Sequence, residues 1–233
     1  MIREWIDVAL FKKTPEQVAK EATMKDGFIN VVIAALITAV ITSILSGIAL
    51  IVSGAFDSGL IGAGAGIVGA IIMFVASIIM APIAAVIVLA IGAGIVHLFA
   101  KLLGGKGSYS SMIGTIGVIN ASIAMTYMLV LAIISGLLGI FAIGPIAFVV
   151  AMITIPIGLA QFIASIVELY LTIKGIAAVQ KFSMLNAALS IIIPMAILLV
   201  IAVILLVIAA VIFGAAILTA LAGSGITGMF GLM

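Results

Sequence analysis

Long uncharged apolar runs, separated by short polar interruptions, dominate the chain from residue 28 onward. The first, Phe28 to Val52, has no charged residue and exceeds the ~20 residues that a helix needs to cross a ~30 Å hydrocarbon core. Other apolar runs cover residues 60–97, about 112–136, 146–173 and 184–213. This pattern predicts an all-α fold, a polytopic membrane helical bundle with five transmembrane helices in residues 28–213.

The second run, Leu60 to His97, has two interpretations because it is too long for one simple span and too short for two spans with a loop. It is either one helix kinked at Pro82 or two helices that meet in a tight hairpin near Pro82. A single crossing returns Lys101 and Lys106 to the side of the basic N-terminal stretch. Because cationic residues near span ends prefer the cytoplasm, we favour the single crossing.

Charge distribution then predicts the orientation. With five spans, all nine Lys and Arg residues lie on the N-terminal side, in the N-terminal stretch and in loops at residues 101–106 and 174–181. We therefore expect a multi-pass protein of the cell membrane with its N-terminus inside and its C-terminus outside. Residues 214–233 form an uncharged, Gly-rich tail, expected outside or at the interface.

Composition excludes a soluble fold. Hydrophobic residues make up 67% of the chain, charged residues 7%, and the mean hydropathy is +1.64. A typical soluble domain is about half apolar and about a quarter charged. The chain has no cysteine and one histidine, so we expect no metal site and no cofactor.

Residues 1–27 predict short amphipathic helices on the cytosolic or interfacial side. The first stretch places apolar residues, among them Ile2, Trp5 and Ile6, near one helical face. It is either a helix lying at the membrane interface or a helix packed on the rest of the protein. Thr14 and Gln17 then predict a capping box around Pro15, with a polar helix that Gly27 ends.

The stretch from His97 to Ser111 contains the sequence GGKGS, which invites comparison with a phosphate-binding loop. A Walker loop needs GxxxxGK[ST] between a strand and a helix, whereas this sequence joins two apolar runs. We instead expect Gly104 to end a helix, Gly105 and Gly107 to permit the turn, and Ser108 to cap the next helix. Lys101 and Lys106 suit lipid head groups, and the other candidate contacts to lipid or a partner are Lys12, Lys13, Lys174 and Lys181.

The sequence H-L-F-A-K-L-L-G-G-K-G-S-Y from His97 to Tyr109 resembles the Yip-one domain family (Ypt/Rab-interacting membrane proteins) in its prokaryotic form. The F-K-K-T-P-E-Q-V lead-in, the F-S-x-x-N-A-A-L stretch from Phe182 to Leu189, and Pro194 agree with it. The resemblance covers roughly residues 10 to 212. It implies five spans with a cytosolic N-terminus, and eukaryotic members of the family are associated with small GTPases and vesicle traffic.

Glu168 lies inside an apolar run, about 9 Å before Lys174 at 1.5 Å per residue. His97 lies at a comparable depth on the second run. Because ionisable groups inside a membrane are normally paired, face a cavity or serve a function, we hypothesise that Glu168 meets His97 or Lys101. The alternative is that Glu168 reaches the interface or ties helices together.

These features favour a non-catalytic membrane scaffold or interaction partner that acts through its basic cytosolic face. The alternative is a protein for permeation of a small solute or ion that uses the Glu168/His97 region. No catalytic set is recognisable, so we do not expect an enzyme. The expected partners are membrane lipids and membrane or cytosolic proteins, with a homo-oligomer left open and no nucleic acid.

Overall fold

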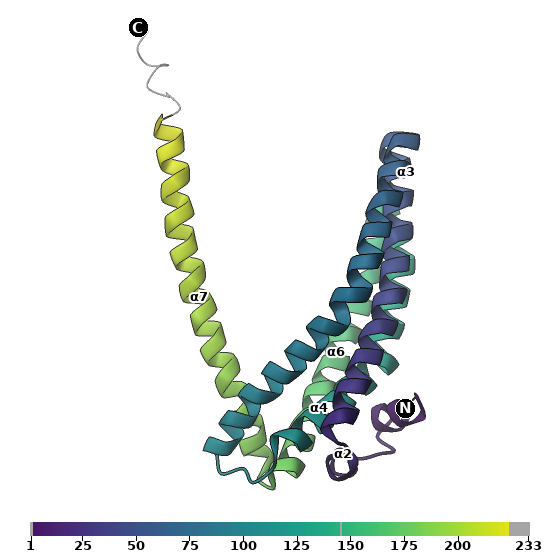
Figure 1. Cartoon of the computed structure of the whole chain (residues 1–233). Helices are drawn as coiled ribbons and strands as arrows, with labels where there is room; N and C mark the ends of the chain where they lie inside the picture. Colours follow the sequence, from purple (N-terminus) through teal and green to yellow (C-terminus); the bar gives the residue numbers. More distant parts are fainter. Residues whose placement is uncertain (1, 145, 224–233) are drawn as a thin grey trace. The chain divides into compact units, whose positions relative to one another are not determined.

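The structure is a computed structural model that describes residues 2–144 and 146–223, with side-chain surroundings up to Phe213. Its described residues form helices and short turns without strands (Figure 1). Four helical stretches are long and apolar enough to cross a membrane: Met24–Leu102, Tyr109–Ile140, Ile146–Gln180 and Met184–Phe213. The expectation of an all-helical membrane protein is therefore confirmed.

Two short helices precede the long ones. α1 (Ile2–Ala9) and α2 (Pro15–Glu21) are separated by a turn, and the capping box predicted at Thr14 forms, with Gln17 N donating to Thr14 Oγ1 at 3.3 Å. A second capping box joins Thr23 to Asp26 and starts α3 (Met24–Leu102). The prediction that Gly27 ends a helix is wrong, because Gly27 lies in the first turn of α3.

α3 reverses direction at Ser58 and Gly59, so it consists of two helical arms. Gly59 has φ 61° and ψ −140°, a conformation open to glycine and strained for other residues. The arms approach each other where small residues face the opposite backbone, as at Gly54 and Gly62. The second arm stays helical from Leu60 through Pro82 to Leu102, which excludes a hairpin near Pro82.

α4 (Tyr109–Ile123) is the buried helix of the compact unit formed by residues 1–190. A π-helical turn, η1 (Ala124–Met128), connects it to α5 (Leu129–Ile140). An apolar core cluster lies where α1 and α2 pack against α4 and α6 (Ile146–Gln180), so the N-terminal helices are part of the core. Its buried members are Val8, Ala9, Val18, Val118, Ile119, Ile123 and Leu171.

The last two long helices differ from the predicted boundaries. α6 contains Pro156 and continues to Gln180, so Lys174 lies inside a helix, and the predicted loop at residues 174–181 is wrong. Ser183 precedes α7 (Met184–Gly223) and accepts a hydrogen bond from Asn186 N, as a helix cap does. α7 continues past Phe213, where the last span was predicted to end, into the predicted tail at residues 214–233, and residues 224–233 lie outside the described residues.

A glycine contact joins the start of α3 to α4. A Cβ atom added to Gly117 would lie 2.6 Å from the Cα of Gly27, and one added to Gly114 would lie 2.6 Å from the carbonyl oxygen of Thr23. Such distances are too short for a side-chain carbon, so the two helix backbones touch directly. Small residues permit this close packing between helices in membranes.

We predict that Gly117→Ala destabilises the protein by about 1–3 kcal/mol, the usual cost of overpacking. The added methyl group has no room against Gly27, and both backbones would have to separate. The midpoint of thermal unfolding in detergent measures the effect. Gly92→Ala is the matched control, because open space surrounds Gly92, and its midpoint should stay equal or rise. Equal midpoints for Gly117→Ala and the wild type would contradict the close approach.

Candidate functional site

Gln180, the last residue of α6, is fully buried and connects three other segments. Its side-chain Oε1 accepts a hydrogen bond from Gly107 N at 3.0 Å, and its Nε2 lies 3.0 Å from His97 Nδ1. Its Nε2 also donates to Met112 Sδ at 3.4 Å, and its backbone carbonyl accepts from Lys106 N at 2.9 Å. One side chain therefore ties the end of α6 to α3, to α4 and to the turn between them.

The turn between α3 and α4 fits closely against Gln180. Gly104 has φ 89°, and Gly105 and Gly107 lie so close to α6 that a Cβ atom on either would collide with Gln180 Oε1 or Val179 O, respectively. Ser108 then caps α4, because its Oγ accepts from Ser111 N at 3.1 Å. Glycine is required here both for the turn and for the close approach to α6.

His97 is a structural connector in this arrangement. When Gln180 Nε2 donates to its Nδ1, the neutral ring carries its proton on Nε2. The ring lies against Tyr109, with 5.7 Å between the ring centroids, and the Tyr109 hydroxyl donates to Ala90 O at 2.7 Å. His97 thus links the second arm of α3 to both α4 and α6.

The hypothesised meeting of Glu168 with His97 or Lys101 is wrong. Gln180, the partner of His97, lies twelve residues beyond Glu168 on the same helix, which is about 18 Å along the axis. Glu168 instead faces Asn120 of α4, whose amide nitrogen, in the orientation that satisfies both groups, donates to Glu168 Oε1 at 3.3 Å. Lys101 lies in the last turn of α3 and is exposed.

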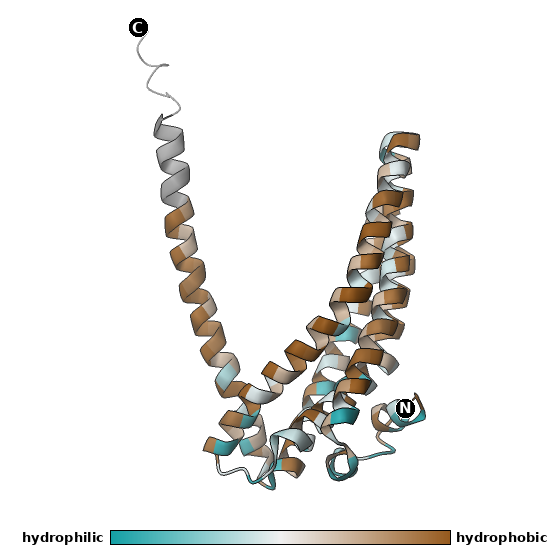
Figure 2. Cartoon of the chain, in the orientation of Figure 1, coloured by the Kyte–Doolittle hydropathy of each residue, from teal (hydrophilic) through white to brown (hydrophobic). Residues whose placement is uncertain are grey.

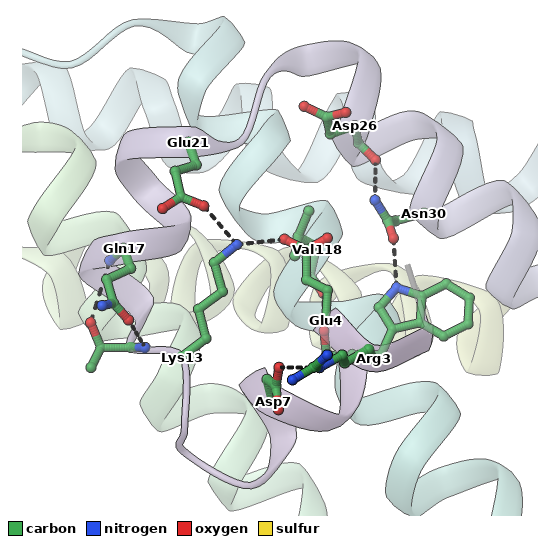
Figure 3. Close-up of polar contacts among 12 residues, drawn as sticks. Arg3, Glu4, Asp7, Lys13, Gln17, Glu21, Asp26, Asn30 and Val118 are labelled. Atoms are coloured by element: carbon green, nitrogen blue, oxygen red, sulfur yellow. Dashed lines mark hydrogen bonds and ion pairs between the residues drawn. The ribbon is translucent and has the colours of Figure 1, made fainter.

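Lys13 fastens α1 to α2 (Figure 3). Its ammonium group lies 2.6 Å from Glu4 Oε1 and 2.8 Å from Glu21 Oε2. Partial burial lowers the pKa of Lys13, but the hydrogen bonds and charges of Glu21 and Glu4 outweigh it, and the pKa is raised above its ordinary value. Lys13, a candidate for lipid contact, is therefore engaged within the protein.

A second polar connection fixes α1 on α3. The indole nitrogen of Trp5 donates to Asn30 Oδ1, and Asn30 Nδ2 donates to Asp26 O at 2.7 Å (Figure 3). The Tyr127 hydroxyl donates to Ala9 O at 2.9 Å. Trp5, Val8 and Ala9 are buried in this packing.

A pocket of about 600 Å³ lies between α2, the turn before α4, and the end of α6. Three lysines line it: Lys20 from α2, Lys106 from the turn, and Lys181 just after α6. Glu16, Ser108 and Ser111 contribute the remaining polar side chains. The structure thus brings together two of the predicted contact residues, Lys106 and Lys181, and adds Lys20.

The other candidate contacts lie elsewhere. Lys174 places its ammonium group 4.9 Å from the centroid of the Tyr170 ring, and Lys12 is exposed near the end of α1. Two further cavities, of about 390 and 270 Å³, lie among the apolar helices and are lined mainly by small or apolar side chains. Neither is lined by Glu168 or His97.

Comparison with known proteins finds no match: no family model, no curated protein and no solved structure is similar to this chain. The resemblance to the Yip-one domain family stays a prediction that rests on the residues from His97 to Tyr109 and from Phe182 to Leu189. The site itself is therefore the basis for any functional conclusion.

Sequence reasoning missed Gln180 and Lys20. Gln180 lies beside Lys181 at a helix end, where polar residues are common. Hydropathy therefore does not indicate that Gln180 is buried. Lys20 belongs to a polar helix with many charges, and the pocket exists only because α2 packs against α6. No local sequence pattern indicates that the side-chain amide of a residue will be buried and bonded to the backbone of a distant loop.

Proposed function

We propose that this chain is a five-span membrane protein, with its N-terminus in the cytosol, that serves as a non-catalytic scaffold or interaction partner. The observation that carries the proposal is the polar end of residues 1–190, where α1 and α2 pack against α4 and α6 and where Gln180 holds the turn before α4 against the end of α6 (Figure 2). The resemblance to the Yip-one domain family agrees with this role.

The reversal of α3 supports the count of five spans. Each arm, residues 24–57 and 60–102, exceeds the ~20 residues that a crossing requires. With two crossings in α3 and one in each of the three other long helices, all nine basic residues belong to the N-terminal side. This distribution follows the positive-inside rule and supports an outside C-terminus and a location in the cell membrane.

The outer side of α1 supports contact with the lipid head-group layer. Ile2, Ile6 and Leu10 are exposed, although α1 buries Trp5, Val8 and Ala9 against the bundle. The two interpretations of this helix therefore combine: one side packs on the protein, and the other presents apolar side chains that suit the membrane interface. Such a helix would hold the polar end at the level of the head groups.

The permeation alternative depended on Glu168 and His97 lying close together, and they do not. It required Glu168 and His97 at one place along a pathway, whereas His97 bonds to Gln180 and Glu168 faces Asn120. Both side chains form polar contacts between helices, of the kind that hold membrane helical bundles together.

Cysteine labelling in intact cells tests the topology. Because the chain has no native cysteine, Ser58→Cys and Ser110→Cys each introduce a single, exposed thiol. We predict that a membrane-impermeant maleimide labels Ser58→Cys from outside and labels Ser110→Cys only after the cells are permeabilised. Labelling of Ser110→Cys in intact cells would contradict the five-span topology.

Photo-crosslinking in native membranes tests the function. A benzophenone amino acid at Lys12 or Ser110, both exposed at the polar end, should form discrete adducts with another protein. The same amino acid at Ser58, in the reversal of α3, is the control and should give lipid adducts without that protein. Adducts with lipid alone at Lys12 and Ser110, or the same protein adducts at all three positions, would contradict a scaffold that acts through this end.

A further inference from the structure

We infer that the pocket between α2, the turn before α4 and the end of α6 binds the phosphate group of a phosphate ester, from a phospholipid head group or a soluble molecule. The inference deepens the proposed function and rests on it, because it assigns a ligand class to the same polar end. Its basis is the convergence of three lysines on one cavity.

The side chains that line the pocket carry more positive than negative charge. Lys20, Lys106 and Lys181 line it together with a single carboxylate, that of Glu16. Within the described residues, none of these three ammonium groups has a carboxylate oxygen within 4.0 Å, whereas Lys13 has two. Three like charges around one cavity repel each other, and a phosphate dianion placed among them would offset that repulsion.

The hydrogen-bonding groups also suit phosphate. Ser108 and Ser111 line the pocket, and their hydroxyl oxygens lie 2.9 Å apart at the start of α4. The amide of Ser111 is already bonded to Ser108 Oγ, but the helix dipole still favours an anion at the start of α4. Phosphate oxygens accept hydrogen bonds from lysine ammonium groups and from serine hydroxyls, and both line this pocket.

The lysines are attached to a firmly held backbone. Lys106 N donates to Gln180 O, and the flanking Gly105 and Gly107 touch α6 directly. Lys181 adopts φ 55°, the left-handed conformation in which glycine is the usual residue after a helix. The chain thus keeps a lysine side chain on the pocket at a position where the backbone favours glycine.

The size of the cavity fits a head group better than a bare ion. About 600 Å³ falls within the range of sites for small molecules and accommodates a glycerophosphate or a similar ester. The exposed apolar side of α1 belongs to the same polar end, where the proposed topology places lipid head groups. A phospholipid and a soluble phosphate ester share the recognised chemistry, so the experiment must separate them.

The test uses the full chain in a non-ionic detergent and three probes: dihexanoyl phosphatidic acid, glycerol 3-phosphate, and dihexanoylglycerol, which has no phosphate. Isothermal titration calorimetry measures binding to the wild type and to the double variant Lys106→Gln/Lys181→Gln. Arg3→Gln/Lys25→Gln is the matched control, because it removes the same charge from exposed residues outside the pocket. Thermal unfolding verifies that both variants are folded.

We expect the wild type to bind at least one phosphate probe and not dihexanoylglycerol, with affinity at least tenfold weaker in the pocket variant and within twofold in the control. Binding of phosphatidic acid alone identifies a lipid head group, and equal binding of glycerol 3-phosphate identifies a soluble ester. Unchanged affinity in a folded pocket variant, equal loss in the control, or absence of phosphate binding by the wild type would overturn the inference.

The two proposals fail separately. Phosphate binding in detergent together with no protein adducts at Lys12 or Ser110 contradicts the scaffold function alone. Protein adducts at the polar end together with no phosphate binding contradict the present inference alone. The first result would leave a lipid- or ester-binding membrane protein, and the second a scaffold whose basic pocket contacts protein.

Discussion

The polar end of the protein depends on the side chain of Gln180. Its amide is fully buried and satisfied on both sides, by Gly107 N at the oxygen and by His97 at the nitrogen. Leaving a buried amide without these partners costs about 1–3 kcal/mol per unsatisfied group, so the surrounding segments are held in one arrangement. Lys106 precedes Gly107 and Lys181 follows Gln180 along the chain, so this hydrogen bond also positions the two lysines.

A second constraint is the direct contact of helix backbones through glycine. Lipid supplies no hydrophobic force between apolar helices, so the association of α3 with α4 depends on close packing and on polar contacts. Gly27 and Gly117 provide the close approach, and Trp5 with Asn30 provides a buried hydrogen bond beside it. The N-terminal helices are thereby fixed on α4 and α6, and α2 can form one wall of the pocket.

Hydropathy and capping patterns predict the helical class and some helix starts, because both depend on local sequence, whereas several helix ends differ from the prediction. The capping box at Thr14 and the helix cap at Ser108 are of this kind, and the reversal at Ser58 and Gly59 falls between the two predicted apolar runs that end at Val52 and begin at Leu60. The partners of His97 and Glu168 were predicted wrongly, because depth along a helix does not tell which face a residue occupies or which helices are neighbours. Gln180 and Lys20 gain their importance only from contacts between distant segments, which no local pattern records.

Hydrogen exchange at the amide of Gly107 tests most directly whether Gln180 holds the polar end together. In Gln180→Ala this amide loses its acceptor, whereas the amide of Lys106 keeps the backbone carbonyl of residue 180. A net hydrogen bond of about 1 kcal/mol predicts at least about fivefold faster exchange at Gly107. Gln161→Ala, on the same helix, should leave the rate unchanged. Equal exchange at Gly107 in the wild type and in Gln180→Ala would contradict the account.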